Sequence, residues 1–154
     1  MNYTVGKTGR VLVLRLEHGE AIYTAIESVA KRERVRHAVV WIVGGVRKGR
    51  VVVGPEKDDE FPLKTLVESF DDARELLGVG TLFPGRSGRP TLHLHAAIGR
   101  GRAAIAGCPR LGAECWLVDE VVILELVGVD ARRALDRKSG LRLLSCRSAR
   151  GAAG

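Results

Sequence analysis

The sequence predicts a single α+β domain with a mostly antiparallel sheet. One amphipathic helix pattern lies near the N-terminus, and a run of strand-like segments follows it, which is the order typical of this class. The 154 residues fit one domain with a sizeable core, and a hydrophobic content of 45% is ordinary for a globular protein. The chain shows no internal repeat and no linker, so we expect no second domain.

The first half of the chain contains the one clear helix. A continuous run of β-forming residues predicts a strand at 11–16. Across 20–34 the apolar residues fall at helical spacing with charged residues on the other side, which predicts an amphipathic helix. A second apolar strand is predicted at 38–43, closed by Gly44 and Gly45. A turn at 47–49, a short strand at 50–53 and a loop at 54–59 are then expected.

The second half alternates between strand-like segments and turns. Further strands are predicted at 64–68, 76–83, 91–98, 102–106, 115–127 and 141–144. Residues 71–77 could instead form a helical turn, and 130–138 predicts a short helix or turn. The glycine- and proline-rich segment 84–90 is expected to be a loop. We expect the domain to span 1–147 and a flexible tail to span 148–154.

The charge and the cysteine content indicate which partners, growth temperature and redox state suit the protein. The formal net charge is +7, and a basic surface attracts nucleic acid and other polyanions. The basic residues form separate clusters, so a solvated surface explains them about as well as DNA binding does. Glutamine is absent, asparagine and methionine occur once each, and 28% of residues are charged, which favours a thermophile. The three cysteines form no CxxC pair, so no disulfide framework is predicted.

The chain is predicted to be cytoplasmic. Its first residues lack the basic-then-apolar pattern of a signal peptide. The longest uncharged apolar run, 38–46, is too short to cross a bilayer, so no membrane partner is expected.

A metal site is suggested by His93 and His95. They alternate with apolar residues in a predicted strand, so both imidazoles lie on one face, about 7 Å apart between Cα atoms. Two imidazoles at this spacing can converge on one metal ion. Cys108 offers a third, soft ligand beyond a predicted hairpin near Gly101. The alternative is that two surface histidines merely form a hydrogen bond, and residue types alone leave both interpretations open.

The order of motifs resembles the plants and prokaryotes conserved (PPC) domain, which accompanies AT-hook motifs in plant DNA-binding proteins. The resemblance covers roughly residues 8–145. It rests on the following segments: Leu16-Glu17-His18-Gly19-Glu20 before the helix, the apolar strand 38–46, Glu75-Leu76-Leu77-Gly78-Val79-Gly80-Thr81-Leu82, Leu92-His93-Leu94-His95, Ala106-Gly107-Cys108, and Asp119-Glu120-Val121-Val122-Ile123. It implies a curved antiparallel sheet flanked by one main and one or two short helices, usually assembled as a homotrimer. It also implies metal binding through the histidines of His-x-His and Gly-Gly-His motifs.

Two departures from the family pattern matter. Cys108 stands where the family has its third histidine, which keeps a metal site plausible and tilts it towards zinc, because thiolate is a good zinc ligand. Pro109 fixes the backbone directly after this residue. The second departure is the missing AT-hook: 86–90 reads Arg-Ser-Gly-Arg-Pro within a predicted loop and lacks the Arg-Gly-Arg-Pro centre.

Three functions remain open at this stage. One is a homotrimeric DNA-associated regulatory or architectural protein with a zinc site at His93, His95 and Cys108. Another is a hydrolase-like metal-dependent enzyme, in which a His2Cys site activates water and Glu114 or Glu120 could serve as general base. The third is a trimer that binds partners or small molecules and has no DNA role. No catalytic residue and no substrate can be assigned from the sequence.

Overall fold

The computed structural model describes residues 1–147, so the predicted tail at 148–154 lies outside the described residues. The ten elements are β1 (Lys7–Glu17), α1 (Ile22–Arg32), β2 (Ala38–Pro55), β3 (Thr65–Phe70), β4 (Arg74–Pro84), β5 (Pro90–Arg100), β6 (Ala103–Gly107), β7 (Ala113–Val127), β8 (Ala131–Leu135) and β9 (Arg142–Cys146). The main sheet has the order β1-β7-β2-β4-β5-β6, with β3 paired to β2. All its pairings are antiparallel, which confirms the predicted class.

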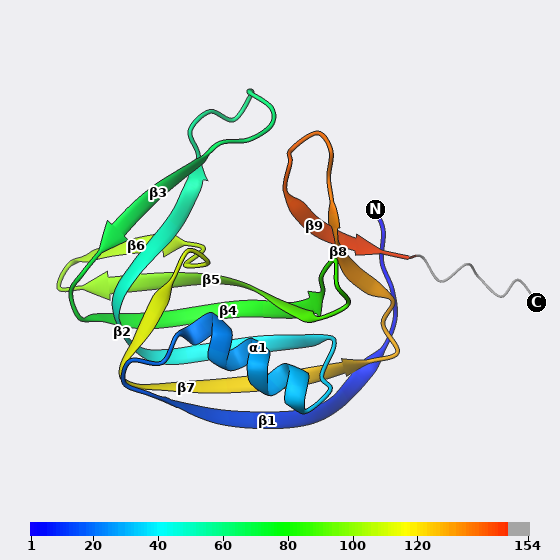
Figure 1. The fold of residues 1–154 in the computed structure, drawn as a ribbon, viewed down its shortest axis with the longest axis horizontal. Coiled ribbons are helices and arrows are strands. Elements are labelled where there is room, and N and C mark those ends of the chain that lie inside the picture. Colours follow the sequence, from blue (N-terminus) through cyan, green and yellow to red (C-terminus); the bar gives the residue numbers. More distant parts are fainter. Residues whose placement is uncertain (148–154) are drawn as a thin grey trace, which may run out of the picture.

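The core lies between α1 and one face of this sheet (Figure 1). Ile22, Ile26 and Ala30 form the buried stripe of the helix, as the helical spacing of the sequence predicts. They pack against buried strand residues such as Ile42 and Leu94. Lys31 and Arg32 close the helix, where positive charge is favourable near the C-terminal carbonyls. Within residues 1–147, no helix has the length and hydropathy needed to cross a bilayer.

Strand β2 is much longer than predicted. The expected break at Gly44 and Gly45 and the expected turn at 47–49 both lie inside it. At these glycines β7 bulges towards β2. A side chain would not fit there, because a Cβ at Gly45 would lie 2.5 Å from the carbonyl oxygen of Trp116. Beyond this point β2 pairs with β7 on one side and β3 on the other, so its backbone stays hydrogen-bonded.

The additional short helices are also corrected by the structure. Residues 130–138 contain strand β8, which pairs with β9 as a separate two-stranded sheet. The helix prediction is wrong. Arg132 is exposed and Arg133 is buried, and this alternation is typical of a strand. Residues 71–77 do not form a helical turn, since β4 begins at Arg74. In Figure 1 the β8–β9 hairpin and the β2–β3 extension rise from opposite ends of the main sheet.

Asp119 is an ionisable group inside this core. Its side chain is fully buried on β7, and neither carboxylate oxygen has a hydrogen-bond partner within the described part of the chain. Burial raises its pKa to about 6, because the apolar surroundings disfavour the charged form. The folded protein therefore holds this proton more tightly than the unfolded chain does.

We predict that the ionisation of Asp119 lowers the free energy of unfolding as pH rises from about 4 to 7. An acid whose pKa is raised from 3.8 to about 6 costs roughly 3 kcal/mol of stability across that window. Asp119→Asn should remove most of this dependence, because the amide does not ionise. Chemical denaturation at pH 4, 5, 6 and 7 measures it, with Asp58→Asn in an exposed loop as the matched control. An unchanged pH slope in Asp119→Asn would contradict the assignment.

Candidate metal centre

The two histidines of the predicted cluster lie on β5, on the face of the sheet that α1 leaves uncovered. Leu92, Leu94 and Ala96 are buried in the core, and side chains alternate along a strand. His93 and His95 therefore point to the opposite, open face. Their Nε2 atoms lie 3.2 Å apart and their ring planes meet at 87°.

Cys108 lies beside the histidines because β6 stops pairing with β5 before it reaches them. The two strands pair only as far as Gly107, opposite Ala96. Cys108 then exchanges both backbone hydrogen bonds with Val52 of β2, each 2.9 Å long. A Cβ at Gly107 would lie 2.3 Å from the carbonyl oxygen of Val52, so this close approach requires glycine. The exchange holds the buried Cys108 beside the free edge of β5.

The three side chains together form a donor set that suits zinc. The ligand atoms of His93, His95 and Cys108 all lie within 4.8 Å of one another. Tetrahedral zinc with Zn–N bonds of about 2.0–2.1 Å separates two nitrogens by about 3.3 Å, close to the observed 3.2 Å. That distance also fits a hydrogen bond between the imidazoles. The buried thiol is the additional feature that favours a metal.

Helix α1 completes the surroundings of Cys108. The Leu92 N–H donates to Glu27 Oε1 at 2.8 Å, so α1 hydrogen-bonds to the unpaired edge of β5. The Tyr23 hydroxyl lies 3.3 Å from the Leu94 carbonyl oxygen and 3.6 Å from Cys108 Sγ. Burial, reinforced by Cys108, raises the pKa of Tyr23, so the phenol stays protonated and its single O–H can donate either to the Leu94 carbonyl oxygen or to the sulfur. Hydrogen bonds of this kind orient metal ligands.

Electrostatics keep His93 in its ligating form. Burial, together with the smaller effect of the positive charges of Arg133, His95 and Arg110, lowers its pKa to about 4. The imidazole is therefore neutral at neutral pH, the state in which histidine binds metals.

The cluster faces a cavity of about 1240 Å³ on the open side of the sheet. Its walls come from β2, β4, β5, the end of β6 and the β8–β9 hairpin. Thus the ligand atoms lie at the surface of a space large enough for a small organic molecule.

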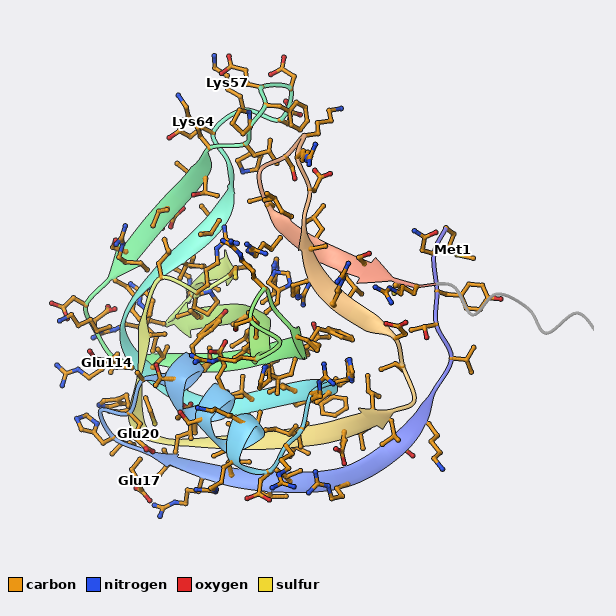
Figure 2. All side chains as sticks on the ribbon, turned by 45° about the vertical axis from the view of Figure 1, so that its right-hand side comes forward. Met1, Glu17, Glu20, Lys57, Lys64 and Glu114 are labelled. Carbon is orange, nitrogen blue, oxygen red and sulfur yellow. The ribbon has the colours of Figure 1, made fainter. Side chains whose placement is uncertain are left out.

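The two carboxylates considered as general bases lie elsewhere. Glu120 is exposed on β7 and lies opposite Arg15 of β1 in the strand register. Glu114 lies at the start of β7, and Figure 2 shows it at the same end of the molecule as Glu17 and Glu20. Neither residue lines the cavity of the histidines. The same figure places Lys57 and Lys64 at the tip of the β2–β3 extension.

Sequence reasoning missed three residues near the cluster. Tyr23 lies in the predicted helix, and nothing in the helical pattern marks a partly buried tyrosine as a site residue. Arg133 belongs to a basic cluster that the sequence explains equally well as solvated surface or as a DNA contact, but it is only 9% exposed. Arg110 lines the cavity two residues after Cys108. A buried position for Arg133 could have been suspected only if residues 131–135 had been recognised as a strand.

Solved structures with the same architecture span nearly the whole chain. A metal-containing protein from Archaeoglobus fulgidus is similar with a TM-score of 0.83 and 23% identity, covering 94% of this chain and 99% of that protein. A plant- and prokaryote-conserved (PPC) protein from Pyrococcus horikoshii gives 0.79 and 23%, covering 94% and 96%. A candidate DNA-binding protein from Bacteroides thetaiotaomicron gives 0.76 and 19%, covering 94% and 99%. Among curated proteins, no sequence matches this chain.

A family model agrees with this architecture. The model of the Plants and Prokaryotes Conserved domain, abbreviated PCC or PPC, matches residues 3–127. This range runs from β1 through β7 and includes all three residues of the cluster. The order of motifs in the sequence, the sheet topology and the model agree, and the chain belongs to the Plants and Prokaryotes Conserved domain family.

Proposed function

We propose that this chain is a zinc-binding PPC protein that works as a homotrimer and presents an open metal coordination position to a ligand cavity. The convergence of His93, His95 and the buried Cys108 within 4.8 Å carries this proposal. The similar fold named as a metal-containing protein in Archaeoglobus fulgidus supports it. Iron, manganese and magnesium fit less well, because thiolate and imidazole together prefer zinc.

Three protein ligands leave one position for water or a bound molecule, and zinc in such a site polarises the group that occupies it. The chain's own residues prepare the site: Tyr23 can orient the Cys108 sulfur, and His93 is kept neutral. Among residues 1–147, no aspartate or glutamate lines the cavity. The hydrolase alternative lacks a carboxylate base, so ligand binding is the better-supported role.

The homotrimer proposal rests on the face of the sheet opposite α1. Cross-strand partners share a face, and one row across five strands reads Val13, Val122, Trp41, Val79 and His95. Val13 is 76% exposed, Trp41 43% and Val79 54%. Contiguous apolar surface of this kind marks an interaction site. We assign it to contacts between copies of this chain, three in number as in the family.

DNA association is the second candidate function. The net charge of +7 favours contact with phosphates, and similar folds from Bacteroides thetaiotaomicron and Ralstonia eutropha are named as candidate DNA-binding proteins. Charge alone supports nonspecific binding that weakens as salt rises. An affinity that stays constant between about 50 and 200 mM salt would contradict it.

Metal content tests the zinc centre. We expect elemental mass spectrometry of untagged protein to find about one zinc per chain, and about tenfold less in Cys108→Ser and His93→Ala, because losing one ligand weakens the site strongly. His18→Ala is the matched control, since this histidine lies outside the cluster and should leave zinc unchanged. A wild-type protein that is metal-free and cannot be loaded with added zinc would contradict the proposal.

Mass in solution tests the assembly. We expect light scattering to give the mass of three chains for the wild type and of one chain for Val43→Asp. Val43 is 52% exposed on the open face, so a charge there costs little in the monomer but prevents apolar burial between copies. Val5→Asp, before β1, is the control and should remain trimeric. A monomeric wild type would refute the trimer, and a trimeric Val43→Asp would show that this face is not its interface.

A further inference from the structure

The cavity beside the proposed zinc centre has an unusual charge balance. Four arginines line it, and the described residues contribute no acidic side chain to its wall. These arginines are Arg86, Arg110, Arg133 and Arg142. Within residues 1–147 none of them forms an ion pair, although six ion pairs occur elsewhere. The positive charge of this cavity is therefore uncompensated by the protein.

Arg133 is the buried member of the group. It is only 9% exposed, and its Nη2 donates to Thr81 Oγ1 at 2.6 Å while its guanidinium lies 5.6 Å from the Phe83 ring centroid. Its buried Nε has no hydrogen-bond partner in the described structure. Burying a guanidinium whose donors are not all paired is costly, and an anion in the cavity that Arg133 lines would offset its charge. The incompletely paired, buried guanidinium therefore points to an anionic ligand.

The register of the sheet brings Arg133 next to the metal ligands. Thr81, which holds the guanidinium, is the cross-strand partner of His93. Arg133 and Arg110 line the same cavity as His93 and His95. An anion bound by these arginines would thus lie beside the open coordination position.

We propose that the cavity binds a small organic oxyanion, a carboxylate or a phosphate ester, between Arg133, Arg110 and the metal. Guanidinium groups recognise both head groups through paired N–H donors, and zinc accepts oxygen ligands. The remaining wall is mostly aliphatic, including Val53, Leu143 and Leu144, so an apolar body can accompany the charged head. This inference rests on the proposed zinc centre only for the metal contact; the arginine contacts are independent of it.

Calorimetric titration with inorganic phosphate, and with acetate in parallel, tests the proposal on zinc-loaded protein and on chelator-treated protein. We expect at least one anion to bind the zinc-loaded wild type, and the tighter of the two identifies the head group. Affinity should fall about tenfold in Arg133→Met and in Arg110→Gln, because each removes charge-assisted hydrogen bonds. Arg102→Gln is the matched control, since Arg102 is exposed in the β5–β6 turn and does not line the cavity.

The outcomes separate the two proposals. If neither anion binds the wild type, or if both arginine variants bind as tightly as wild type, the anion site is overturned even where zinc content is intact. If the protein holds no zinc but binds phosphate in an Arg110- and Arg133-dependent way, the anion site stands and the zinc centre fails. Arg110→Gln keeps the test valid if Arg133→Met does not fold, because Arg110 is exposed.

Discussion

The site depends on one backbone exchange, in which Cys108 pairs with Val52 of β2 instead of continuing along β5. Gly107 permits it, because no side chain fits against the Val52 carbonyl oxygen. The exchange frees the edge of β5 at Leu92–His95, where Tyr23 and Glu27 of α1 contact the exposed backbone groups. It also places a buried thiol beside two imidazoles. The free edge of β5, the contacts that α1 makes with it and the convergence of the three ligand side chains thus all follow from this exchange.

The two faces of the sheet have different roles, because successive side chains along each strand point to opposite faces. One face packs its aliphatic side chains against α1 and forms the core. The other carries exposed apolar rows that end at His93 and His95 and continues into the arginine-lined cavity. Metal, ligand and subunit contacts would therefore all lie on the face that the single chain leaves uncovered. A ligand in the cavity and an adjacent subunit would be close neighbours.

Local patterns in the sequence predict most of the fold. Helical spacing identifies α1, and alternation with motif order identifies the antiparallel sheet and the family. The long strand β2 could not be predicted, because Gly44 and Gly45 break strands in most contexts but here admit the bulge of β7. Strand β8 was missed because its arginine-rich segment resembles solvated surface, whereas Arg133 packs on Phe83. The strand predicted at 141–144 corresponds to β9.

The sequence also predicts the candidate site in part. Spacing placed His93 and His95 on one face, and motif position added Cys108. It could not reveal Tyr23, Arg133 or Arg110, since their roles depend on contacts between residues distant in the chain. The carboxylates suggested by proximity in sequence, Glu114 and Glu120, lie outside the cavity for the same reason. The closeness of these two residues to Cys108 in the sequence does not place them near His93 and His95 in the fold.

X-ray absorption at the zinc edge of the zinc-loaded protein reports whether Cys108 ligates the metal. We expect a four-coordinate ion with one sulfur at about 2.3 Å and nitrogen or oxygen ligands at about 2.0–2.1 Å. The sulfur shell should disappear in Cys108→Ser. A spectrum without a sulfur neighbour in the wild type would show that Cys108 is not a ligand and would contradict the site as described.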